Sequence, residues 1–186
     1  MILIVDMNCR KDSLGYHEFV LPIASIIKDF EEAVVKHYSD VSHEEARDAR
    51  DYSRIVLSGT ALKDEGYLSK IADFEWIRQS DKPILGICAG MQTIGLVFGS
   101  SLQNCLEIGM TSIRTTKENS LFSSAFKAYE LHKYSIKPSL ELDVLAESNN
   151  CVQAIKHGER NIYGVLFHPE VRNRRIIEQF IFLSEH

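Results

Sequence analysis

One cysteine of the sequence stands where a nucleophile could be mounted. Cys88 is the central residue of the pentad Gly86-Ile87-Cys88-Ala89-Gly90, which follows directly on an apolar run. This is the cysteine form of the G-x-S-x-G elbow, a sharp strand-to-helix turn that lifts the central side chain above a sheet. Glycines on both sides relieve crowding, and a helix N-terminus favours the reactive thiolate. The pentad alone also fits a cysteine buried at a strand end.

A histidine and a glutamate near the C-terminal end could supply the base and its orienting group. A predicted strand over 162–167 leads into His168, and a proline separates His168 from Glu170. Proline favours extended backbone in the residue before it, and residues two apart in an extended chain point to the same side. Alone, this motif also fits a strand-end histidine with a surface glutamate. Together with the elbow, it favours a Cys-His-Glu triad of Cys88, His168 and Glu170.

The elements that must position these residues alternate in the first half of the chain. Short apolar runs predict buried strands at Ile2–Asp6, Ala33–Tyr38, Arg54–Ser58 and Pro83–Ile87. Helices are predicted over Pro22–Glu32, Tyr67–Ser80 and Ala89–Phe98, and a capping box predicts another at Ser42 and Glu45. Such alternation implies right-handed crossovers and a parallel sheet covered on both faces. Chemistry is expected at the carboxyl ends of its strands.

The second half of the chain has a different pattern. Shorter strands are predicted at Ile108–Thr116, Ala128–Ser135, Leu142–Ser148, Cys151–Lys156 and Ile162–Phe167. His157-Gly158 suits a hairpin between the last two strands, and a helix over Asn173–Ser184 closes the chain. We therefore expect one α/β domain over residues 1–186. It should be a flavodoxin-like three-layer sandwich, with a mostly parallel central sheet, helices on both faces and a small antiparallel extension.

Composition excludes several classes of function. Hydrophobic residues make up 45% and charged residues 25%, which is ordinary for a globular protein, and the net charge of −5 argues against a nucleic-acid partner. Arg172, Arg174 and Arg175 are expected on a solvated helix face. No apolar stretch approaches the roughly 18–20 residues of a membrane span. We expect a reduced, cytoplasmic protein without a structural metal, because the cysteines are widely spaced: Cys9, Cys88, Cys105 and Cys151.

The two motifs together resemble those of class I, triad-type glutamine amidotransferases, which carry G-I-C-x-G-x-Q and F-H-P-E. The resemblance extends along nearly the whole chain: "MILIVD" is similar to the family's first strand, and "IVLSG" to its oxyanion-loop strand. Within the family, the chain most resembles the separate glutaminase subunits of archaeal-type GMP synthase. That likeness rests on "SLF", "VLAES" and "AIKHGERNIYGV".

The resemblance implies an activity and a mechanism. Cys88 would attack the side-chain amide of L-glutamine, and His168, held by Glu170, would pass a proton to the departing ammonia. Hydrolysis of the γ-glutamyl thioester would then release glutamate. The amides of Ala89 and of the Gly59-Thr60 loop would bind the oxyanion.

The resemblance also implies how glutamine is held. Gln92 matches a family glutamine that contacts substrate. The stretch Leu131–Tyr134, which includes Lys133 and Tyr134, occupies the place where the family binds the amino-acid end through main-chain groups.

The chain departs from the synthase pattern in three places. Thr60 stands where those glutaminases have a second glycine, and threonine disfavours the positive φ that a flip of the oxyanion loop would need. Leu131-His132-Lys133-Tyr134 replaces S-H-x-D, so an acid linked to communication with the synthetase is lost. "MNCRKDSLGYHE" replaces an aromatic-glycine-glutamine segment. The triad is retained through all three changes.

These glutaminases normally deliver ammonia to a synthetase active site. The chain has neither a G-x-x-x-x-G-K-[ST] loop nor an S-G-G-x-D-S loop for ATP. We therefore expect a partner synthetase chain, with the ATP-pyrophosphatase subunit of GMP synthase as the candidate, and no cofactor here. ATP and Mg²⁺ are expected only on that partner. Because of Thr60, glutaminase activity is expected to be low until the partner docks.

Two other functions remain open at this point. The chain could be a catalytically weak member of the fold kept as a binding or regulatory subunit, which the altered oxyanion loop favours and the intact triad opposes. It could also be a cysteine hydrolase on a related flavodoxin-like sheet, either a γ-glutamyl peptidase or a stress-type chaperone-hydrolase. The F-H-P-E motif is not expected in that group.

Overall fold

The computed structural model describes residues 1–42, 44 and 51–184 of the chain. Five strands form a parallel half-sheet: β1 (Ile2–Asp6), β2 (Ala33–His37), β3 (Arg54–Leu57), β4 (Ile84–Ile87) and β9 (Ile162–Val165). Four of them lie where the apolar runs of the first half predict strands, and β9 lies within the strand predicted at Ile162–Phe167. The predicted capping box falls partly outside the described residues, since Glu45 is not among them.

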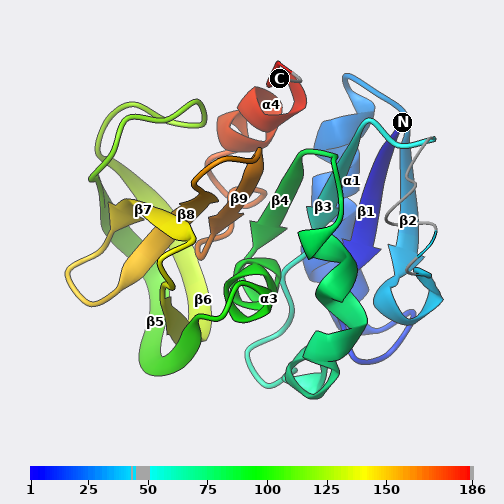
Figure 1. Cartoon of the computed structure of the whole chain (residues 1–186), viewed down its shortest axis with the longest axis horizontal. Helices are drawn as coiled ribbons and strands as arrows, with labels where there is room; N and C mark the ends of the chain where they lie inside the picture. Colours follow the sequence, from blue (N-terminus) through cyan, green and yellow to red (C-terminus); the bar gives the residue numbers. More distant parts are fainter. Residues whose placement is uncertain (43, 45–50, 185–186) are drawn as a thin grey trace.

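The described strands form one nine-stranded sheet in the order β2-β1-β3-β4-β9-β8-β7-β5-β6. From β9 onward every pairing is antiparallel, through β8 (Val152–His157), β7 (Leu142–Glu147), β5 (Ser101–Thr115) and β6 (Phe126–Lys137). This half curls away from the parallel half (Figure 1). The predicted antiparallel extension and its β8–β9 hairpin are confirmed. The extension is longer than expected, because β5 begins at Ser101 rather than near Ile108.

Helices cover both faces of the parallel half (Figure 1). The first face carries α1 (Leu21–Lys28) and α4 (Arg175–Ile181), and the second carries η3 (Gly66–Arg78) and α3 (Ala89–Val97). Side chains alternate along β1, so Ile2 and Ile4 join the core under α1 while Leu3 and Val5 join the core under η3 and α3. The predicted three-layer sandwich is confirmed.

The helices differ from the prediction in length and in type. Both α1 and α4 are shorter than predicted, and two short helical turns, η1 (Tyr16–Val20) and η2 (Tyr38–Asp40), are added. The segment predicted as an α-helix over Tyr67–Ser80 is a 3-10 helix, interrupted at Lys70 with φ −122° and ψ 17°. A spacing of three residues suits 3-10 geometry better than the α-helical 3.6, and that is the spacing of the apolar residues Leu68, Ile71, Phe74 and Ile77. Within the described residues, no helix has the length and apolar character of a membrane span.

Three neighbouring parallel strands bring the motifs to one edge. β4 pairs with β3 on one side and β9 on the other. The carboxyl ends of these strands therefore lie together, at the lower edge of the sheet in Figure 1. β3 leads into Gly59, β4 into Cys88, and β9 toward His168.

Candidate active site

The backbone at Cys88 is strained in the way that an elbow requires. Cys88 has φ 49° and ψ −102°, and it is one of two non-glycine residues with positive φ in the described chain. Residues other than glycine rarely adopt this backbone conformation, and those that do are often found at functional sites. The amide of Cys88 donates to the carbonyl of Val165 at 2.8 Å, and its carbonyl accepts from the amide of Gln92 at 3.0 Å. The turn from β4 into α3 is thus held from both ends.

The two glycines of the pentad are required because a larger side chain at either position would clash with the backbone. A Cβ at Gly86 would lie 2.4 Å from the carbonyl carbon of Gly90. A Cβ at Gly90 would lie 2.5 Å from the carbonyl oxygen of Leu57. Backbone atoms cannot yield easily, so the predicted reason for both glycines is confirmed.

His168 and Glu170 form a buried pair. Nδ1 of His168 lies 2.7 Å from Oε1 of Glu170, and neither side chain has exposed surface. The amide of His168 donates to the carbonyl of Tyr129 at 2.9 Å, which ties this segment to β6. The predicted pairing is present, but its local reason differs: β9 ends at Val165, so a bend and a turn, rather than an extended strand, bring the two side chains together.

The electrostatic setting of His168 suits a proton carrier. Burial by itself would lower the pKa of His168, but the negative charges of Glu170 and Cys88 oppose it and hold that pKa well above its usual value. Nε2 is buried and has no hydrogen-bond partner among the described residues. Since Glu170 occupies Nδ1, Nε2 is the nitrogen left to exchange a proton.

Gly59 places the loop after β3 against both His168 and Cys88. A Cβ at Gly59 would lie 2.7 Å from Cε1 of His168 and 3.5 Å from Cβ of Cys88. The loop at Gly59 therefore packs against both the imidazole and the elbow. Neither Gly59 nor Thr60 has a positive φ, and the hydroxyl of Thr60 donates to the carbonyl of Asp64 at 3.1 Å.

The space next to Cys88 is very small. A cavity of about 20 Å³ adjoins Cys88, whose exposed fraction is only 4%. Four of the six residues predicted to bind substrate line it: Thr60, Gln92, Lys133 and Tyr134. The other two adjoin Cys88 directly, Gly59 across the loop and Ala89 as the first residue of α3. The thiol of Cys88 lies 3.7 Å from the carbonyl oxygen of Leu131.

Gln92 bridges the two walls of this cavity. Its Nε2 donates to the carbonyl of Tyr134 at 2.8 Å, and its Oε1 accepts a hydrogen bond from the hydroxyl of Tyr67. Tyr67 is buried, and burial raises its pKa, so it is a neutral hydroxyl donor. The sequence places Tyr67 only in a helix and gives no reason to expect this role.

A buried polar cluster supports the β6 segment from behind. Nδ1 of His132 donates to the carbonyl of Cys105 at 2.9 Å, while its Nε2 lies 3.2 Å from carboxylate oxygens of both Glu107 and Glu130. Ligand-type atoms here lie within 4.8 Å of one another, so the cluster could be considered for a metal. However, Glu107 already accepts hydrogen bonds from side-chain amides at 2.6 and 2.8 Å. We interpret the cluster as a support that holds His132, the residue between Leu131 and Lys133.

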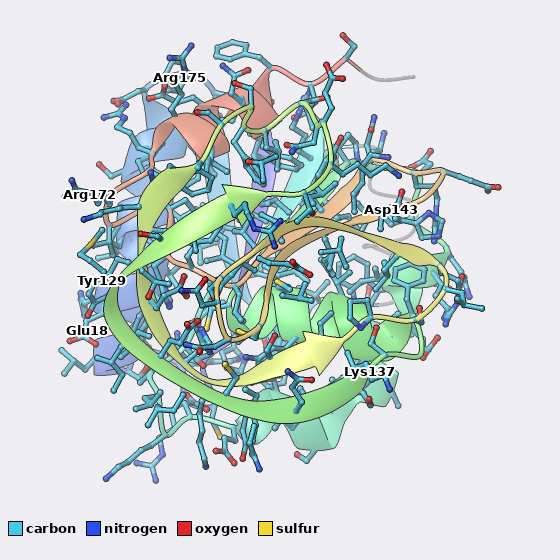
Figure 2. All side chains as sticks on the ribbon, turned by 90° about the vertical axis from the view of Figure 1, so that its left-hand side faces the viewer. Glu18, Tyr129, Lys137, Asp143, Arg172 and Arg175 are labelled. Atoms are coloured by element: carbon cyan, nitrogen blue, oxygen red, sulfur yellow. The ribbon has the colours of Figure 1, made fainter. Side chains whose placement is uncertain are left out.

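The arginines near the C-terminal end lie on an exposed face, as predicted. Arg174 pairs with Asp29 and Glu178 at 3.0 and 2.7 Å. Figure 2 shows Arg172 on the same side of the molecule as Tyr129. A cavity of about 590 Å³ lies here, away from Cys88.

Comparison with known proteins identifies the family. The model of the family described as "Glutamine amidotransferase class-I" matches residues 21–184. The chain belongs to this family. A protein of Picrophilus torridus, named as a subunit of glutamine-hydrolyzing GMP synthase, is 35% identical over 131 residues, which are 66% of this chain and 70% of that protein. The protein of the same name from Saccharolobus solfataricus is 31% identical over 147 residues, covering 74% and 78% of the two chains.

Another relative is matched over a shorter stretch. The GMP synthase subunit of the same name from Methanocaldococcus jannaschii is 43% identical over 96 residues, which are 48% of this chain and 51% of that protein. That match therefore spans about half of the relative's length.

Solved structures agree with the class-I amidotransferase fold. A crystal structure of a Thermoplasma acidophilum protein, described as a candidate subunit of GMP synthase, has a TM-score of 0.82 and 26% identity, covering 97% of this chain and 92% of that one. A glutamine amidotransferase from Thermotoga maritima has a TM-score of 0.68 at 21% identity, covering 97% and 80%. The second likeness concerns the fold alone.

Proposed function

We propose that the chain hydrolyses L-glutamine to glutamate and ammonia through a Cys-His-Glu triad of Cys88, His168 and Glu170. The observation that carries the proposal is the strained elbow at Cys88 beside a buried His168–Glu170 pair 2.7 Å apart. Family membership favours this activity over that of the related cysteine hydrolases.

The chemistry follows from the charges of the site. The Cys88 thiolate attacks the side-chain carbonyl carbon of glutamine, and the resulting oxyanion accepts hydrogen bonds from the amide of Ala89 and from the Gly59-Thr60 loop. When the C–N bond breaks, protonated His168 gives its proton to the leaving nitrogen, which departs as ammonia. Neutral His168 then takes a proton from water as the oxygen attacks the thioester, releasing glutamate and restoring the thiolate.

The remaining predicted residues surround the substrate. Tyr134 offers main-chain groups, Gln92 fixes them through its bond to the Tyr134 carbonyl, and Lys133 stands at the mouth of the cavity. The triad chemistry requires no metal or organic cofactor in this chain.

We further propose that the ammonia passes to a separate synthetase chain. Relatives from three archaea are named as a subunit of a glutamine-hydrolysing GMP synthase, which supports an ATP-pyrophosphatase partner and a place in purine biosynthesis. ATP and Mg²⁺ would then bind to that partner, and the pair would work in the cytoplasm.

Two observations favour a second candidate, a catalytically weak binding or regulatory subunit. The Cys88 thiol is almost fully covered, and Thr60 occupies the oxyanion loop. Labelling with 6-diazo-5-oxo-L-norleucine, a glutamine-like electrophile, separates the two candidates.

The active enzyme should gain one adduct, located at Cys88 by peptide mass spectrometry, and should release ammonia from glutamine. Both results should be lost in Cys88→Ala. Absence of the adduct in the wild type, with and without an ATP-pyrophosphatase chain, would reject the enzymatic proposal. Co-purification of such a chain tests the partner separately.

A further inference from the structure

The cavity beside Cys88 is closed by one pair of opposite charges. Nζ of Lys133 lies 2.6 Å from Oε1 of Glu65, and both residues line the cavity. Glu65 belongs to the segment between β3 and η3, and Lys133 belongs to β6, so the pair joins opposite walls. The side chain of Glu65 is 37% exposed and that of Lys133 is 50% exposed. The pair therefore sits at the mouth of the cavity.

A second tie joins the same walls at greater depth. Tyr67, two residues after Glu65, donates to Gln92, which donates in turn to the carbonyl of Tyr134, the residue after Lys133. Tyr67 and Gln92 are 3% and 2% exposed, so breaking this tie would leave buried polar groups unpaired, which is costly. An exposed ion pair, by contrast, contributes little to stability. The outer tie is thus the one that can open while the inner tie keeps the walls in place.

Glutamine cannot bind unless the outer tie opens. A cavity of about 20 Å³ holds roughly one water molecule. With the side-chain amide of glutamine at Cys88, the α-carbon end must extend toward the mouth. That end carries an ammonium and a carboxylate, the same two charges that Lys133 and Glu65 present to each other.

We propose that Glu65 binds the α-ammonium group of glutamine and Lys133 binds its α-carboxylate, the two side chains pairing with each other only while the site is empty. The inference rests on the proposed glutaminase function and adds side-chain recognition to the main-chain recognition expected from the resemblance. The exchange replaces one ion pair by two, so each charge remains compensated throughout. Lys133 is also held with its Nζ 5.0 Å from the centre of the Tyr134 ring, beside the main chain that would hold the substrate.

Electrostatics agree with this assignment. The hydrogen bond to Lys133 lowers the pKa of Glu65, and the hydrogen bond to Glu65 raises the pKa of Lys133. Both groups are therefore charged at neutral pH and available to a zwitterionic ligand.

Two Cys88 reagents distinguish a charged subsite from an ordinary surface ion pair. Iodoacetamide is small and uncharged, whereas 6-diazo-5-oxo-L-norleucine carries the α-ammonium and α-carboxylate of glutamine. In Lys133→Met the mouth is no longer tied, so iodoacetamide should modify Cys88 severalfold faster. The concentration of the norleucine reagent that gives half-maximal labelling should instead rise about tenfold, because the carboxylate of the reagent loses its partner. Glu65→Gln should show the same split to a smaller extent.

The matched control is Lys117→Met, which removes another exposed lysine. Nζ of Lys117 lies 2.7 Å from a carboxylate oxygen of Asp143, and neither residue lines the cavity. It should leave the labelling of Cys88 by both reagents unchanged. If Lys133→Met also leaves both unchanged, or alters both in the same direction, the subsite is rejected while the glutaminase function stands. If iodoacetamide labels wild-type Cys88 but the norleucine reagent does not, with and without an ATP-pyrophosphatase chain, the proposed function fails and this inference fails with it.

Discussion

Gly59 leaves no room for a side chain against His168. A Cβ at Gly59 would lie 2.7 Å from Cε1 and 3.2 Å from Nδ1 of the imidazole, closer than carbon atoms normally approach a ring. The loop that follows β3 thus packs directly on the ring that Glu170 orients, and it can do so only as long as residue 59 is glycine. This contact links the proposed oxyanion loop to the proposed base.

Replacing Gly59 by alanine should therefore damage activity more than stability. The added methyl group displaces the imidazole by a fraction of an ångström to about one ångström, and a shift of that size costs about 10²-fold in rate. Ammonia release from glutamine and the thermal unfolding midpoint should be measured together. Gly158→Ala is the matched control, because a Cβ there would meet only the carbonyl oxygen of Glu141, at 3.8 Å. Equal activity in both variants would contradict the contact.

Replacing Glu170 by glutamine should lower kcat/KM on the order of 10²-fold and shift its pH dependence. The carboxylate charge is one of the causes that raise the pKa of His168 against burial, so its loss lowers that pKa. Activity needs the proton that His168 gives to ammonia, and the alkaline limb of the kcat/KM profile should move to lower pH. Glu159→Gln, at an exposed glutamate, should leave the profile unchanged. A shift to higher pH would contradict the assignment.

The turn at Cys88, the pairing of His168 with Glu170 and the parallel half of the sheet could be predicted because their causes are local. The pentad around Cys88 encodes its own turn, and His168 and Glu170 are only two positions apart. The residues around them depend on distant pairing. His132 meets Glu107 only because β5 and β6 pair in one register across a bulge between Asn104 and Glu107.

The segment that carries Glu65 and Tyr67 is harder to predict for another reason. It follows a loop whose path depends on contacts such as Thr60 with Asp64, and it continues as a 3-10 helix rather than an α-helix. Neither feature has a strong pattern in the sequence. Sequence reasoning therefore misses the side chains that close the cavity, except Lys133, which the family resemblance supplies.

Glu130 should make the stability of the protein fall as pH rises. Burial raises the pKa of Glu130, while the imidazole of His132, whose Nε2 lies 3.2 Å from a Glu130 oxygen, acts in the opposite direction. Above the ordinary value of 4.5 the native state therefore keeps a proton that the unfolded chain has released. Stability is present in full below that value and is lost as pH rises through the raised pKa.

Glu130→Gln keeps the shape and removes the titration. Urea unfolding should give similar stabilities for variant and wild type near the unfolded pKa, and a variant more stable on the order of 1 kcal/mol at neutral pH. Glu118→Gln, at an exposed glutamate, should have the stability of the wild type at both pH values. A variant that is less stable at neutral pH would mean that the charged Glu130 stabilises the fold through His132.

Replacing Thr60 by glycine should raise the glutaminase activity of the isolated chain. Thr60 is buried, has a negative φ and is held through its hydroxyl to the Asp64 carbonyl. A loop flip that presents another amide to the oxyanion would need a positive φ, which costs a side chain about 1–2 kcal/mol that glycine avoids. The basal rate should rise about fivefold to tenfold, while the rate with a synthetase partner, which supplies the flip by docking, should change little. Thr60→Ser keeps the hydroxyl and its Cβ, so it should stay near the wild type. If the isolated wild-type chain already works at the rate of the complex, Thr60 is no barrier, and the loop is already set for catalysis in the conformation of this structure.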